Sequence, residues 1–224
     1  MATEYTVSIN ALLKDTLPEL PGVVRSVAAK EFRLTLREFF EKTYAWTAVV
    51  KSVVVPLGET PIQLTDSDAN TEVIGIMHVA KGNTDDGFVD LIPLADRPSS
   101  RSQGDTAEYP DTWYVTSNPD ELVLYPYLSV ATTDTLTVKV ALMPSFDLDA
   151  TENVLPRQIV SKYYDAIMDG FLARMYGHPN KPYSAPILAT SKRTSFVTSM
   201  GFYAAQRKRG YNGTPNWRYP GGWK

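Results

Sequence analysis

The sequence predicts an α+β fold in which a helical bundle, formed by N- and C-terminal helices, carries an inserted antiparallel β module and an extended C-terminal arm. Three observations predict it. Apolar residues recur at three- and four-residue steps near both ends of the chain, β-branched and aromatic residues crowd its middle, and Gly and Pro dominate its last residues. These patterns divide the chain into a discontinuous helical domain (1–43 and 154–209), a β domain (44–153) and an arm (210–224).

Two helices are expected before residue 44. The longer one, Leu20–Thr43, has a single apolar stripe, and Pro21 suits its first turn, where a missing N–H is not needed. A shorter amphipathic helix, Ser8–Leu17, precedes it, and the Ser8 side chain can cap its first turn.

The middle of the chain predicts strands separated by turns. One polar stretch, Arg97–Tyr109, predicts a long exposed loop among them. The expected strands are rich in Val, Ile, Thr and aromatic residues, and they cover Tyr44–Val55, Ile62–Leu64, Glu72–Ala80, Phe88–Leu91, Thr112–Thr116, Glu121–Tyr125 and Thr135–Leu142.

The C-terminal part predicts a helical hairpin. One helix runs from about Leu155 to Tyr176, with Gly177 just past its end, and a second begins after Ser184 and ends near Arg209. A glycine inside a helix costs about 1 kcal/mol relative to alanine. Gly170 and Gly201 therefore predict places where another element approaches closely.

Charge is unevenly distributed along the chain. Residues 56–153 contain 17 acidic and 4 basic side chains, a net charge of −13, and residues 181–224 contain 8 basic and no acidic ones, a net charge of +8. The simplest interpretation is an uneven solvated surface. The alternative is two oppositely charged faces, one for each of two neighbours.

The composition offers little for catalysis. The chain has no cysteine and only two histidines, His78 and His178, and it contains no phosphate-binding glycine loop and no nucleophile elbow. No apolar run is long enough to cross a membrane and no signal peptide is expected. We therefore expect neither an enzyme nor a metal or cofactor. A hydrolase that uses an acidic pair stays as an alternative, although the carboxylates cluster in turn-like segments.

The C-terminal arm predicts a contact with a partner. Large aromatic side chains are costly to leave in water and are enriched at interfaces. The alternatives are that these aromatic residues fold back on their own domain, or that they stack on single-stranded nucleic acid. The expected partner-binding residues are Arg207, Lys208, Arg209, Tyr211, Trp217, Arg218, Tyr219, Trp223 and Lys224.

The first helix of the hairpin Lys162–Arg209 carries Ile167, Gly170, Leu172, Arg174 and Met175, its turn reads Pro-Asn-Lys-Pro-Tyr, and its second helix ends in a basic run. In these features the hairpin resembles the head-to-tail adaptor proteins of short-tailed bacteriophages. Tyr183 stands where members of that family often have Trp. The residues expected to pack this hairpin are Gly170, Arg174, Pro179, Pro182, Tyr183 and Phe196.

The resemblance implies a structural virion protein of the phage neck, assembled in the host cytoplasm. Such proteins form a ring, typically of twelve copies, between the portal protein and the tail nozzle protein, and DNA passes through the ring without sequence-specific binding. The arm would then contact the portal, and the β module would face the nozzle. Two further alternatives are another neck or tail-completion protein, and a nucleic-acid-binding protein that uses the basic aromatic tail.

Overall fold

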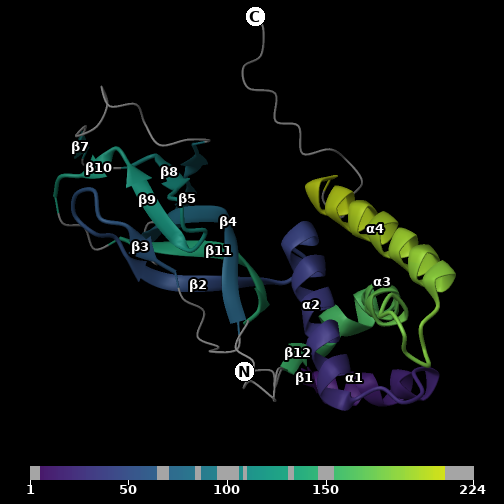
Figure 1. Ribbon diagram of the computed structural model, residues 1–224. Helices are drawn as coiled ribbons and strands as arrows, with labels where there is room; N and C mark the ends of the chain where they lie inside the picture. The colour runs from purple at the N-terminus through teal and green to yellow at the C-terminus, as the bar shows by residue number, and fades with distance from the viewer. Residues whose placement is uncertain are drawn as a thin grey trace, which may run out of the picture. The chain divides into compact units, whose positions relative to one another are not determined.

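The computed structural model describes residues 6–64, 71–83, 87–94, 106–107, 110–130, 134–145 and 154–209. The chain divides into two compact units (Figure 1). The helical unit comprises Met1–Ala45 and Phe146–Lys224, and the β unit comprises Trp46–Ser145. The β unit is thus inserted into the helical unit. It begins two residues after and ends eight residues before the expected bounds, 44 and 153.

Within the described residues, the helical unit contains four α-helices and one small sheet. The strands β1 (Thr6–Ser8) and β12 (Val154–Pro156) pair antiparallel and bring the two segments of the unit together. A 3₁₀ turn at Leu17–Glu19 follows the first helix. The helices are α1 (Ile9–Thr16), α2 (Arg25–Thr43), α3 (Arg157–Tyr176) and α4 (Pro186–Arg209).

The expected fold class, a helical bundle with an inserted antiparallel β module, is wrong. The described structure is mixed, 44% helical and 33% strand, and two of its strand pairs are parallel. Helices α3 and α4 pack along one another as a hairpin, and α2 contacts both of them. Sequence periodicity shows which face of an element is buried, but it does not show the element's partner or crossing angle.

The described residues of the β unit form two four-stranded sheets and one pair of short parallel strands. The first sheet has the order β2-β11-β4-β5, the second has the order β3-β9-β8-β6, and β7 pairs with β10. The strands are β2 (Thr47–Val54), β3 (Ile62–Gln63), β4 (Thr71–Asn83), β5 (Gly87–Asp90), β6 (Ile92–Pro93), β7 (Thr106–Ala107), β8 (Thr112–Val115), β9 (Glu121–Tyr125), β10 (Tyr127–Leu128) and β11 (Thr135–Pro144).

Strand β11 is an inner strand of the β2-β11-β4-β5 sheet, and its side chains alternate between buried and more exposed positions, as the sequence predicts. Leu136, Val138 and Val140 are fully buried, whereas Lys139 is exposed. The start of β2 lies beside the end of β11, since Thr47 is in register with Ala141 and the Leu142 N–H donates to the Trp46 carbonyl at 2.9 Å. The chain therefore enters and leaves the β unit at neighbouring points.

Several element boundaries differ from the expected ones. Helix α2 begins at Arg25, five residues later than expected, because Gly22 adopts a left-handed φ of 76° and Val24 is extended. Pro21 therefore precedes the helix. The Ser8 cap is confirmed: its hydroxyl oxygen accepts from the Ala11 N–H at 3.2 Å. Most of the expected loop Arg97–Tyr109 lies outside the described residues, and its described part includes β7.

Candidate functional site at the junction of the three long helices

The helices α2, α3 and α4 meet at Gly170. A Cβ atom on Gly170 would lie 2.7 Å from Thr35 Cγ2 of α2 and 2.8 Å from two ring carbons of Phe196 of α4. Such separations are far shorter than a normal carbon–carbon contact. Only glycine fits there, and this close approach agrees with the expectation from the sequence. The same expectation is wrong for Gly201, because a Cβ atom there would meet no described atom within 4 Å.

Aromatic side chains fill the interior around this point. Phe39 of α2 lies with its ring centroid 5.3 Å from that of Tyr163 and 6.3 Å from that of Phe196. Tyr163 in turn meets Tyr203 edge-on at 4.8 Å. Phe39 and Phe196 have no solvent exposure. One apolar cluster therefore joins all three helices.

Ion pairs surround the aromatic cluster and centre on Glu38. Its carboxylate accepts hydrogen bonds from Arg174 of α3 at 2.8 Å and from Arg193 of α4 at 2.9 Å. Burial by itself raises the pKa of Glu38, but the two guanidinium hydrogen bonds and charges outweigh it and hold that pKa below its ordinary value. Glu38 therefore ties α2 to both members of the hairpin.

Two further groups of charges extend this network. Lys192 of α4 donates to Asp169 of α3 at 2.6 Å, and this hydrogen bond raises the pKa of Lys192 against the opposing effect of burial. Glu31 of α2 lies 3.7 Å from the Arg174 guanidinium and 3.5 Å from His178 Nε2. Each of these charges has a structural partner in a neighbouring segment.

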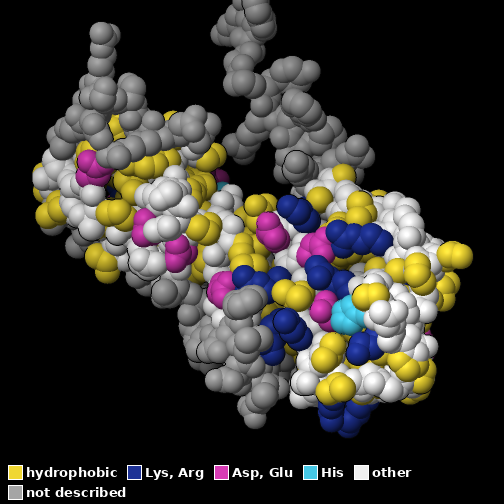
Figure 2. All heavy atoms as spheres, in the orientation of Figure 1, with side chains coloured by type: hydrophobic (Ala, Val, Ile, Leu, Met, Phe, Trp, Pro, Cys, Tyr) yellow, Lys and Arg dark blue, Asp and Glu magenta, His cyan; other side chains and the backbone are white. Residues whose placement is uncertain are grey.

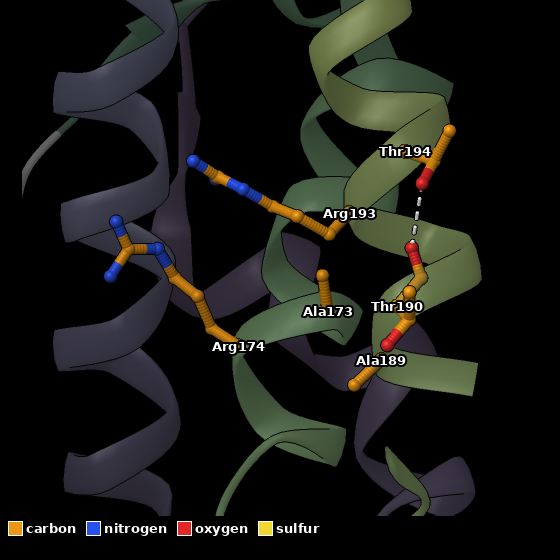
Figure 3. A pocket seen from close by; sticks show the side chains of 6 residues that line it. All are labelled: Ala173, Arg174, Ala189, Thr190, Arg193 and Thr194. Atoms are coloured by element: carbon orange, nitrogen blue, oxygen red, sulfur yellow. Dashed lines mark hydrogen bonds between the residues drawn. The ribbon is translucent and has the colours of Figure 1, made fainter. Parts of the chain in front are cut away.

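A hollow of about 500 Å³ opens beside the network. Figure 3 shows that Arg174 and Arg193 extend toward α2, where Glu38 engages both, and that Thr190 and Thr194 lie along α4. The two threonine hydroxyls donate to backbone carbonyls of α4 at 3.0 Å. The polar groups of this hollow are thus committed to the fold, and their arrangement suits a rigid scaffold better than a substrate site.

The β unit has a second hollow, of about 460 Å³, lined in part by Glu59 and Tyr114. The buried Tyr127 belongs to the same part of the unit, and burial, followed by the influence of Tyr114 and Glu59, raises the pKa of its phenol. Hydrogen bonds from Thr116 and Asn118 lower the pKa of Glu121. The hollow has aromatic and carboxylate walls, but no described pair of carboxylates faces a common point across it.

The histidines have structural surroundings. His78 of the β unit forms an exposed pair with Asp90 at 3.0 Å, and His178 of the helical unit pairs with Glu31. The carboxylate clusters near residues 66–68 and 147–152 lie outside the described residues, as does part of the cluster near 85–90. The hydrolase alternative, which rested on these carboxylates, therefore stays untested.

The expected packing residues of the hairpin separate into two groups. Gly170, Arg174 and Phe196 meet at the junction, and Tyr183 is buried beside His178, with ring centroids 6.4 Å apart. The prolines at 179 and 182 lie in the connecting turn and are exposed. The sequence did not predict that Thr35 and Glu38 of α2 take part in the junction. For Glu38 the only signal in the sequence was its position at the edge of an apolar stripe.

Most of the expected partner-binding residues cannot be placed. Arg207 is half-buried on α4, and Lys208 and Arg209 belong to the last turn of that helix, but the side chains of the latter two are not described. The remaining six lie outside the described residues: Tyr211, Trp217, Arg218, Tyr219, Trp223 and Lys224.

In the described ranges no three His, Asp or Glu side chains gather closely enough to hold a metal ion. None of the helices that the structure describes combines the length and apolar character that a bilayer crossing requires. Comparison with known proteins gives no family for the chain: no protein-family model matches it, and no curated protein matches it either.

Proposed function

We propose that this chain is a structural, non-enzymatic virion protein that acts as a head-to-tail adaptor between the portal protein and the tail nozzle protein of a short-tailed bacteriophage. In this role it forms a ring, of twelve copies by resemblance, and DNA passes through the ring without sequence-specific binding. It functions in the neck of the virion after assembly in the host cytoplasm.

One observation carries the proposal. The hairpin with the family-like residues is locked to α2 by Gly170, Phe196 and the Glu38 ion pairs. An adaptor must transmit load between two large assemblies, and a rigid scaffold with committed charges suits that task. The arm follows directly from the end of α4, so the scaffold gives it a firm base.

The charge distribution supports the same role. The segment 56–153, with its net charge of −13, would repel the phosphates of passing DNA. In the segment 181–224, Lys192 and Arg193 are paired with Asp169 and Glu38, and the other six cations suit a negatively charged partner surface. Identical contacts repeated around a ring would make overall binding strong even if each contact is weak.

The direct experiment mixes the purified full chain with purified portal and images the mixture by negative-stain electron microscopy. We expect an added ring of density beneath the portal. A chain that ends at residue 209 is the matched comparison and is expected to bind more weakly. If no complex forms at micromolar protein, the adaptor proposal is wrong.

The same pair of chains tests the alternatives. A neck or tail-completion protein would bind other tail proteins but not the portal. A nucleic-acid-binding protein would bind DNA in a salt-dependent way and lose this binding when residues 211–224 are removed.

A further inference from the structure

The hollow of the β unit is not used by the proposed function. Its volume of about 460 Å³ is large enough for a long side chain or a small ligand. The described part of its lining contains one carboxylate, that of Glu59, and none of the described lining residues is basic. The other lining groups are aromatic, apolar or hydroxylic, so the hollow has a single charge and that charge is negative.

The backbone holds Glu59 in place at this hollow. The Gly58 N–H donates to the Leu128 carbonyl of β10 at 3.0 Å, with Gly58 at a left-handed φ of 68°. On the other side of Glu59, the Thr60 hydroxyl donates to the Leu57 carbonyl at 3.1 Å. The turn that carries Glu59 is therefore fixed against β10. Glu59 itself is exposed, so a ligand can reach its carboxylate from the solvent.

The opposite wall of the hollow is aromatic. Tyr114 of β8 and Val123 of β9 are partners in register, and both pack against Tyr127 of β10. Tyr114 and Tyr127 are each 3% exposed. Such a wall keeps water away on one side, and the interaction of Glu59 with an opposite charge is stronger in this less polar surrounding than in open water.

The hydroxyl of Tyr127 is a polar group with unfilled capacity next to this wall. Among the described residues, no hydrogen bond of normal geometry reaches it. Burial, followed by the nearby Tyr114 and Glu59, raises the pKa of the phenol, which therefore stays a neutral hydroxyl beside the Glu59 carboxylate. Buried hydroxyls normally have a partner in a folded protein. The lack of one here is explained if a ligand completes the arrangement of these side chains.

We propose that the hollow of the β unit receives the guanidinium group of an arginine side chain from a partner protein. A guanidinium forms two parallel hydrogen bonds with a carboxylate such as that of Glu59, and its weak hydration suits a wall that excludes water. Thr116 of the lining donates to Glu121 at 2.7 Å, so a second negative charge lies beside the hollow.

The charge of the whole segment favours the same occupant. Residues 56–153 have a net charge of −13, which attracts cations over a longer range. In Figure 2 the β unit shows Asp and Glu side chains among apolar ones, and most of the visible Lys and Arg side chains belong to the helical unit. A basic partner surface would therefore be drawn to the β unit before its arginine enters the hollow.

Other occupants fit less well. A phosphate or a carboxylate would meet Glu59 and no cation of the described lining. Free arginine has the same fault, because it brings a carboxylate of its own, whereas an arginine within a protein does not. An apolar group would cover the Glu59 carboxylate without pairing it, which is costly. A lysine would supply the charge but not the paired hydrogen bonds.

The test titrates the full chain, labelled with ¹⁵N, with the peptide acetyl-Gly-Arg-Gly-amide and follows the backbone amides by two-dimensional NMR. The matched control peptide carries citrulline, which has nearly the shape of arginine but no charge. We expect saturable shifts at residues 59, 114–117 and 123, with a dissociation constant in the millimolar range because a single side chain buries little area. The citrulline peptide should bind at least about tenfold more weakly.

Two variants of the chain locate the binding. Glu59→Gln should raise the dissociation constant at least about tenfold, since it removes the charge of the carboxylate and one of its two acceptor oxygens. Asp111→Asn makes the same loss of charge at an exposed position outside the described lining, and it should change the constant by less than about twofold. Unchanged amide positions away from the hollow show that each variant is folded.

The inference is overturned if no shift saturates up to about 50 mM peptide, if the two peptides bind alike, or if Glu59→Gln binds like wild type. Tighter binding of free arginine than of the peptide would also overturn it, because the occupant would then be a small molecule. The titration needs no portal, so its outcome is independent of the adaptor proposal. A chain that binds the arginine peptide but ignores the portal would keep this site and lose the adaptor role.

Discussion

Replacing Gly170 with alanine tests the close approach of the three long helices. An average helix gains about 1 kcal/mol from this change. Here the new methyl group would lie 2.7 Å from Thr35 Cγ2 and 2.8 Å from the Phe196 ring, and overpacking costs about 1–3 kcal/mol at each of these two contacts. The two costs together, less the gain of about 1 kcal/mol in helix propensity, should lower the free energy of unfolding of Gly170→Ala by about 1–5 kcal/mol.

The assay is thermal unfolding of the full chain followed by circular dichroism. A change of 1 kcal/mol shifts Tm by about 2–4 °C in a chain of this size. Gly201→Ala is the matched control, because it is the same substitution in a neighbouring helix with nothing within 4 Å of the new methyl group. We expect this control to raise Tm, by about 2–4 °C, since it gains helix propensity alone.

A second variant identifies the cause of the loss. Thr35→Ser removes the methyl group nearest to Gly170 and keeps the hydroxyl that donates to the Glu31 carbonyl at 2.9 Å. The double variant should therefore lose less stability than the two single changes add up to. If Gly170→Ala unfolds at or above the wild-type temperature, the three helices are not as close as described and the reasoning fails.

Three other outcomes are expected in the same unfolding assay. Glu38→Gln should cost about 1–2 kcal/mol, because it weakens the charge-assisted hydrogen bonds from Arg174 and Arg193. The pKa of Glu38 in the folded chain lies below its ordinary value. The contribution of the Glu38 carboxylate to the free energy of unfolding is therefore complete at neutral pH and is lost as pH falls through that lowered pKa. Wild type should lose more stability on acidification than Glu38→Gln does. Phe196→Ala should cost about 3–5 kcal/mol, because Phe196 is fully buried. Deleting residues 210–224 should leave Tm within about 2 °C, and a larger drop would show that the aromatic tail belongs to the core.

The sequence predicts the elements better than it predicts their assembly. The patterns that predict strands at Thr112–Thr116 and Glu121–Tyr125 depend on neighbours along the chain, and the structure has strands there. The parallel pair of β6 and β8 depends on segments about 20 residues apart, which no local pattern specifies. The start of α2 was misplaced because the apolar stripe continues through residues that the left-handed Gly22 keeps out of the helix.

The candidate site was predictable only in part. Gly170 and Phe196 could be found because glycine inside an apolar helix and a periodic aromatic both suggest packing. Glu38 could not be found, because a glutamate on a helix is usually exposed, and only the structure places Arg174 and Arg193 next to it.

The neighbouring entry and exit points of the β unit have a consequence for how this chain can be engineered. The Leu142 N–H donates to the Trp46 carbonyl, so a short linker could span the place of the β unit without stretching the helical unit. Inserts whose ends meet in this way are generally tolerated and exchangeable. Grafting a different insert between residues 45 and 146 would therefore exchange the surface that the β unit presents and leave the three-helix junction intact.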